Sequence, residues 1–166
     1  MNLDMLVRAG QQPWLPVPQA EDIDVWDKYD FPICGTYRLD SRLVIFTLVA
    51  SAGNRSLWAY VPVPPESEEA VSGARFEAEE EFNEFLAGCF AGRKAVFAAA
   101  EDFVITSKSD GIVIPSGRFG LLTIGAEWYA LRAAVELRNR LTAASEAGNV
   151  SEVLSVAQDA LSGLPA

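Results

Sequence analysis

Histidine is absent from the 166 residues of the chain, and this absence excludes more chemistry than any other feature of the composition. Neither a Ser-His-Asp triad nor a Cys-His pair can form within the chain, and no imidazole can bind a metal ion. With two cysteines, Cys34 and Cys89, a four-ligand zinc site of the Cys/His kind is excluded as well. No catalytic motif based on other residue types is recognisable, so we predict no catalytic residues, no cofactor and no metal.

Long apolar runs are missing too. The longest run, residues 43–50, is interrupted by Thr47 and is far shorter than a membrane-spanning helix. The N-terminal residues lack the basic start and the long apolar stretch of a secretory signal. We therefore expect a cytoplasmic protein without membrane association, whose two cysteines are buried free thiols.

Positive charge is scarce, and the shortage is concentrated in one segment. The net charge is −10, with 13 Lys and Arg against 23 Asp and Glu. Residues 66–92 alone carry 8 glutamates against a single basic residue, Arg75. Such a chain is repelled by nucleic acid and by anionic lipid, so we expect neither as a partner.

Strands are predicted from Pro32 onward. Three apolar runs follow one another, at residues 33–39, 42–50 and 55–61. The links between them, Asp40-Ser41 and residues 51–54, are short and polar, which predicts a β-meander. The middle run is apolar on both alternating faces, so we expect it at the centre of the sheet with both sides covered.

Helices and further strands follow the meander. Apolar residues recur at three- and four-residue steps over residues 66–91, which predicts a helix. Residues 103–108 and 112–115 have strand character, and Asp110-Gly111 between them predicts a hairpin. Two antiparallel helices are expected from Ala126 to the C-terminus.

Together these elements predict an α+β fold. Its mostly antiparallel sheet has about five strands, arranged as a β-meander, a helix and a β-hairpin, with two C-terminal antiparallel helices. Residues 1–31 are predicted to form an extended N-terminal arm, and residues 32–166 a single α+β domain. This order of elements resembles that of small acidic secretion chaperones, which favours a protein partner.

The predicted arm contains two segments with alternative interpretations. Pro13 and Pro16 form a PxxP pattern, which is either a ligand for an aromatic groove or part of an arm whose Trp14 packs on its own domain. Residues 21–30 are rich in aspartate. Asp22 and Asp24 do not continue into a calcium-binding loop, so we interpret them as turn and cap residues.

The first part of the candidate site is a stripe of glutamates on the predicted helix at residues 66–91. Its four members are Glu77, Glu80, Glu81 and Glu84. On a helical projection they fall within about 100° of one another. Three interpretations are open: a solvated helix face, a docking surface for a protein partner with a basic surface, and a cation site.

The second part of the candidate site consists of aromatic residues in or beside the predicted sheet: Tyr29, Tyr37, Trp58 and Tyr60. Aromatic residues on strands either pack under a helix or form a binding surface on an open sheet face. We include Trp58 and Tyr60 among the predicted partner-binding residues.

These features predict a non-catalytic protein-interaction module, such as a chaperone, adaptor or inhibitor, that presents an acidic helix face to a basic partner. A homodimer is a further prediction, because a second copy would cover one face of the apolar central strand. The alternative function is a small-molecule or cofactor-binding domain, including an enzyme that uses carboxylates.

Overall fold

The computed structural model describes residues 2–28, 30–115, 120–146 and 148. The chain divides into two compact units, residues 1–126 and 127–166. The first unit contains the whole sheet, and the last helix, α3 (Gly120–Glu146), continues into the second. Two predicted features lie outside the described residues: the second C-terminal helix and Tyr29. The division into an arm and a domain at residue 32 stays a prediction.

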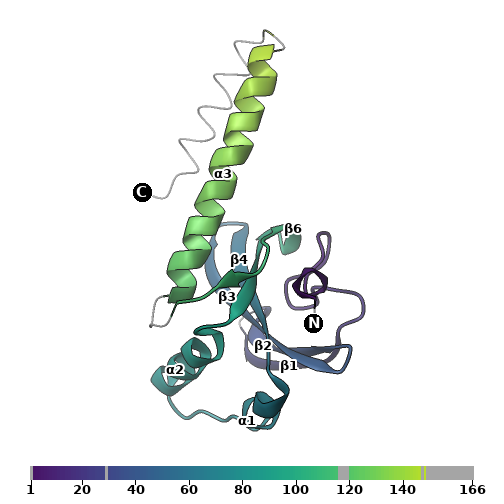
Figure 1. The fold of residues 1–166 in the computed structure, drawn as a ribbon, viewed down its shortest axis with the longest axis vertical. Coiled ribbons are helices and arrows are strands. Elements are labelled where there is room, and N and C mark those ends of the chain that lie inside the picture. The colour runs from purple at the N-terminus through teal and green to yellow at the C-terminus, as the bar shows by residue number, and fades with distance from the viewer. Residues whose placement is uncertain (1, 29, 116–119, 147, 149–166) are drawn as a thin grey trace. The chain divides into compact units, whose positions relative to one another are not determined.

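The first unit is built on one antiparallel sheet, which confirms the α+β class (Figure 1). The sheet has seven strands, compared with the predicted five or so, in the order β1-β2-β3-β4-β5-β6, and β7 pairs with β5. The strands are β1 (Glu21–Lys28), β2 (Pro32–Leu39), β3 (Arg42–Ala52), β4 (Arg55–Pro62), β5 (Lys94–Glu101), β6 (Val104–Lys108) and β7 (Ile112–Val113).

The predicted meander corresponds to β2, β3 and β4. Leu39 lies opposite Arg42, and the two linking residues, Asp40 and Ser41, have φ angles of 49° and 65°. Positive φ at both positions is the requirement of the two-residue turn that matches the twist of paired strands, and Asp tolerates it better than most residues. The polar link therefore sets the register of the hairpin.

The strands after the helices are arranged differently from the predicted hairpin. β6 and β7 do not pair with each other, because both pair with β5: Ala98 lies opposite Lys108, and Ala95 opposite Ile112. Between β6 and β7 the Ser109 hydroxyl accepts a hydrogen bond from the Phe97 amide at 2.8 Å. The chain thus continues along β5, and the Ser109 hydroxyl takes the place of a backbone carbonyl as the acceptor for the Phe97 amide.

The single helix predicted at residues 66–91 is broken. A 3-10 turn (Pro65–Ser67) leads into α1 (Glu68–Ser72), and a separate helix, α2 (Glu79–Phe90), follows after residues 73–78. Gly73 ends α1, as expected for the residue with the least helix propensity after proline. α2 begins with Glu79, Glu80 and Glu81, and carboxylates in a first turn are stabilised by the helix dipole.

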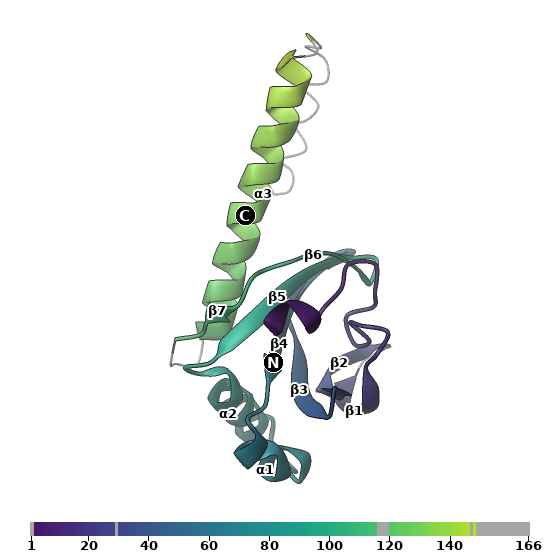
Figure 2. The ribbon, with the colours of Figure 1, turned by 45° about the vertical axis from the view of Figure 1, so that its right-hand side comes forward.

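The N-terminal segment covers one face of the sheet (Figure 2). Leu6, Val7 and Val17 are buried in a cluster with apolar side chains of β2 to β6. Pro13 and Pro16 are buried as well, so this structure does not present them as a PxxP ligand. The arm packs on its own domain, as the alternative interpretation held.

The opposite face of the sheet is also buried. Cys89 and Phe90 of α2 are buried, and Gly125 of α3 lies so close to Phe97 and Leu57 that a Cβ there would stand 2.8 Å from the Phe97 ring. Residues 43–47 of the central strand β3, whose side chains alternate between the two faces, are all buried, so this part of the strand is covered on both sides, as predicted. Among the described residues, no helix is long and apolar enough to cross a membrane.

Candidate functional site

The four glutamates of the predicted stripe are exposed, but they do not all lie on one helix. Glu80, Glu81 and Glu84 lie on α2 and are exposed, together with Glu79. Glu77 is exposed too, but it precedes α2 because the helix breaks after Gly73. The helix therefore presents four carboxylates, and Glu77 adds a fifth from the preceding segment.

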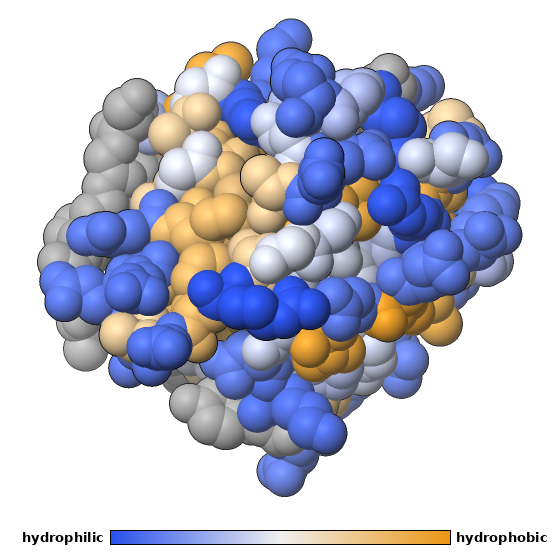
Figure 3. All heavy atoms as spheres, turned by 90° about the horizontal axis from the view of Figure 1, so that it is seen from below, coloured by the Kyte–Doolittle hydropathy of each residue, from blue (hydrophilic) through white to orange (hydrophobic). Residues whose placement is uncertain are grey.

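A row of half-buried aromatic side chains lies beside these carboxylates and joins α2 to β1. Trp26 of β1 contacts Phe82 and Phe85 of α2, with ring centroids 6.4 and 5.9 Å apart. Phe76, from the segment before α2, contacts the same two rings at 5.4 and 4.9 Å. These ring contacts connect β1 to α2 through their side chains. Figure 3 shows the side of the first unit that carries α1 and α2, where hydrophilic residues surround separate hydrophobic patches.

β1 brings a second set of exposed carboxylates to this place: Glu21, Asp22, Asp24 and Asp27. Asp27 lies opposite Cys34 in the antiparallel pair, and opposite residues project from the same face of a sheet. The pKa of the Cys34 thiol is raised to about 12, mainly by burial, with the nearby Asp27 and Cys89 acting in the same direction. Cys34 therefore has β1 on one side and α2 on the other.

β1, α2 and the segment before α2 form what we call the acidic surface, with nine exposed carboxylates and two basic residues, Lys28 and Arg75. Its members are Glu21, Asp22, Asp24, Asp27, Glu77, Glu79, Glu80, Glu81 and Glu84. None of the nine forms an ion pair in the described part of the chain. Within those same residues, no three Asp, Glu or Cys side chains group closely enough to hold a metal ion.

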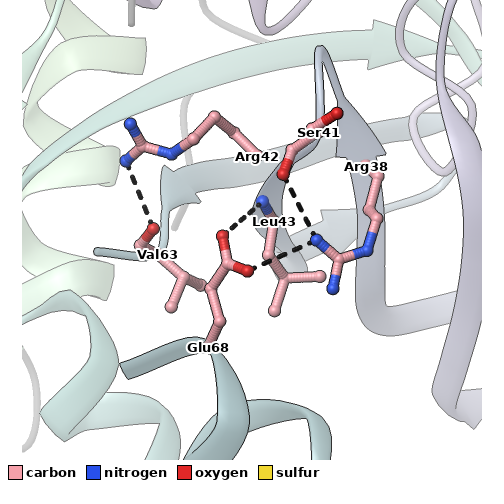
Figure 4. Close-up of polar contacts among 6 residues, drawn as sticks. All are labelled: Arg38, Ser41, Arg42, Leu43, Val63 and Glu68. Carbon is pink, nitrogen blue, oxygen red and sulfur yellow. Dashed lines mark hydrogen bonds and ion pairs between the residues drawn. The ribbon is translucent and has the colours of Figure 1, made fainter. Parts of the chain in front are cut away.

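The described residues contain an ion pair with a different position and role (Figure 4). Glu68 of α1 pairs with Arg38 at 3.4 Å and accepts a hydrogen bond from the Leu43 amide at 3.3 Å. Arg42 donates to the Val63 carbonyl at 3.3 Å. These contacts fasten the start of α1 to the β2–β3 hairpin, so Glu68 is committed to holding the helix and is not part of the acidic surface.

Trp58 and Tyr60 require a correction. Both were expected to contact a partner, but both are fully buried, with exposed fractions of 0%. The Trp58 indole donates to the Ser56 hydroxyl at 2.8 Å, and the Tyr60 hydroxyl donates to the Pro13 carbonyl at 2.6 Å. Tyr37 is buried in the same way and donates to the Leu6 carbonyl at 2.8 Å. Burial raises the pKa of both tyrosines. These aromatic residues belong to the core, because the N-terminal segment occupies the sheet face that they line.

The contribution of β1 was missed from the sequence. Asp22 and Asp24 were interpreted as turn and cap residues, but both lie on β1, although aspartate is depleted in strands. The alternation of Ile23 and Val25 with acidic residues was the available signal, since it is typical of a strand with one polar face. Only the structure shows that this strand lies next to α2.

Comparison with known proteins gives no match. No protein-family model matches the chain, and neither a curated protein nor a solved structure matches it. The inference of function therefore depends on the residues of this chain alone.

Proposed function

We propose that this protein is a non-catalytic interaction module, of the chaperone, adaptor or inhibitor kind, that acts in the cytoplasm and binds a protein partner with a basic surface. The observation that carries the proposal is the acidic surface, whose nine carboxylates are exposed and form no ion pair among the described residues, and whose two elements are joined by the half-buried rings of Trp26, Phe82 and Phe85.

The two components of this surface suit complementary tasks. Carboxylates that are exposed and unpaired attract a basic partner over several ångströms and favour one orientation of approach. Half-buried aromatic rings supply apolar contact area at small entropic cost. A solvated helix face alone would not require the same sign of charge on the neighbouring strand β1.

The net charge of the chain also favours a basic protein partner. The whole chain carries −10, so attraction to a basic protein is not cancelled by other parts of the molecule. The alternative function, a small-molecule or cofactor-binding domain, predicts a different response to salt. Screening weakens binding between exposed charges, whereas an enclosed ligand raises the melting temperature with little dependence on salt.

The test is a pull-down from the lysate of the source cell at low and high salt. The bait variants are the wild type and one in which Glu77, Glu80, Glu81 and Glu84 are replaced by Gln. A control with the same loss of charge replaces four exposed carboxylates elsewhere, at Glu66, Glu69, Asp110 and Glu127.

Basic proteins retained by the wild type and the control at low salt, and lost both at high salt and with the first variant, would support the proposal. Retention of the same proteins by all three baits would contradict it, because binding would then not depend on the acidic surface.

A further inference from the structure

β1 ends the sheet on one side and has no neighbour on its outer edge among the described residues. It is the first strand in the sheet order and pairs only with β2. An edge strand presents backbone N–H and C=O groups that are available to another extended chain. Two of its apolar side chains are also open to solvent, Ile23 at 41% and Val25 at 37% exposed.

The geometry of β1 limits what can add to it. Its pairing with β2 is irregular between Glu21 and Asp24, between Val25 and Asp27, and between Asp27 and Lys28. Such bulges shorten any regular ladder. Backbone hydrogen bonds to an added strand would therefore be few, and side-chain contacts would have to supply much of the affinity.

We infer that β1 binds an extended, lysine- or arginine-rich segment of the partner as an additional strand. This inference rests on the proposed function and specifies how the acidic surface would be used. The added strand would run along β1, where it meets the carboxylates of Asp24 and Asp27 on the side of α2 and the apolar side chains of Ile23 and Val25. An eight-residue strand spans about 26 Å, so a partner segment of similar length suffices.

The negative charge of β1 favours a basic partner segment over a second copy of the chain. Two β1 strands paired with each other would place eight carboxylates against two lysines, and like charges facing each other across a strand pair are destabilising. A basic segment reverses the sign of every such contact. In peptide recognition by strand addition, backbone hydrogen bonds contribute affinity and side-chain contacts contribute specificity.

The probe is an eight-residue peptide of alternating lysine and valine, acetylated and amidated at its ends. Its first control is the same peptide N-methylated at every backbone amide, which keeps the charges but cannot donate hydrogen bonds to a strand. Its second control has glutamate in place of lysine. Affinity is measured by titration at low and high salt, and amide hydrogen exchange of β1 is followed with and without peptide.

The inference predicts that the lysine-valine peptide binds at least about ten times more tightly than its N-methylated form, and that it slows exchange of outward-facing β1 amides by a similar factor. The glutamate peptide should not bind. Equal, salt-sensitive binding of both lysine peptides without protection of β1 would overturn strand addition but leave the proposed function standing. Failure of both lysine peptides to bind at low salt would overturn both proposals.

Discussion

The two edges of the sheet are treated in opposite ways by the same chain. At β6, the Gly10 amide donates to the Ile105 carbonyl at 2.8 Å, and the Ile105 amide donates to the Gln11 carbonyl at 2.9 Å. This edge is closed by the N-terminal segment. At β1, the described part of the chain provides no such neighbour, and the strand carries four carboxylates instead.

An exposed edge strand can pair with other chains and cause aggregation, and the two edges avoid this in different ways. Closing an edge with backbone hydrogen bonds removes it from contact with other chains, and here the closing segment also fills the core with Leu6 and Val7. Bulges and like charges leave the other edge accessible but suppress pairing with another copy. A charged open edge remains available to a partner of opposite charge.

Removal of the closed edge should have the largest effect. Deletion of residues 1–19 would expose the core face lined by Tyr37, Phe46 and Tyr60 and would remove the hydrogen bonds on the outer edge of β6. Each large apolar side chain lost from the core contributes about 1.5–3 kcal/mol, and domains have about 5–15 kcal/mol in total. We expect the deleted protein to lose its cooperative thermal unfolding transition.

A matched pair of point substitutions controls this experiment. Leu6→Ala, at a fully buried position, should destabilise by about 2–5 kcal/mol, whereas Met5→Ala, at a position 52% exposed, should change stability by less than about 0.5 kcal/mol. A deleted protein that unfolds cooperatively with nearly unchanged stability would show that the segment is not part of the core.

The reactivity of the Cys34 thiol can be used to test whether β1 stays packed against the sheet. Its pKa of about 12, compared with about 8.5 for an unfolded thiol, lowers the thiolate fraction at pH 8 roughly a thousandfold. Native Cys34 should therefore react with iodoacetamide slower by about that factor than in denaturant, as measured by mass spectrometry. Native reaction at the unfolded rate would mean that β1 and α2 do not cover the thiol.

The same thiol predicts an alkaline change in stability. Its folded pKa lies above the unfolded value, so the unfolded state loses the proton first as pH rises. The contribution of Cys34 is complete below about pH 8.5 and is lost progressively as the pH approaches 12. Urea unfolding at several pH values should show a smaller alkaline decline in Cys34→Ala than in the wild type.

Gly35 is where the open edge meets the rest of the sheet. A Cβ at this position would collide with the backbone carbonyl of Asp24 on β1. Gly35→Ala should therefore force β1 away from β2 and destabilise by about 1–3 kcal/mol in urea unfolding. The control Gly88→Ala, in open space on α2, should stabilise by about 0.5–1 kcal/mol. Equal effects of the two substitutions would argue against close packing of β1.

Neutralising the glutamates should have the smallest effect on stability. Replacing Glu77, Glu80, Glu81 and Glu84 by Gln removes repulsion on α2 but also removes negative charge from its first turn. These effects oppose each other and are each about 1 kcal/mol or less, so the net change should stay within about 1 kcal/mol. A larger loss in thermal unfolding would give the carboxylates a structural role.

The sequence predicts the parts of this fold that depend on local chemistry. The apolar run of β3 indicates a central strand, and Asp40-Ser41 indicates its turn. The end of α1 at Gly73 was harder to predict, because the helical spacing of apolar residues continues across it. The burial of Trp58 and the grouping of β1 with α2 depend on contacts between distant residues, which no local pattern contains.

The most direct test of the account is amide hydrogen exchange of the free protein, resolved by residue with NMR. The Ile105 amide at the closed edge should exchange at least about a hundred times more slowly than an unprotected amide. The outward-facing amides of β1 should exchange close to the unprotected rate. Protection of every β1 amide to the level of Ile105 would contradict the account, because the acidic edge would then be closed before any partner arrives.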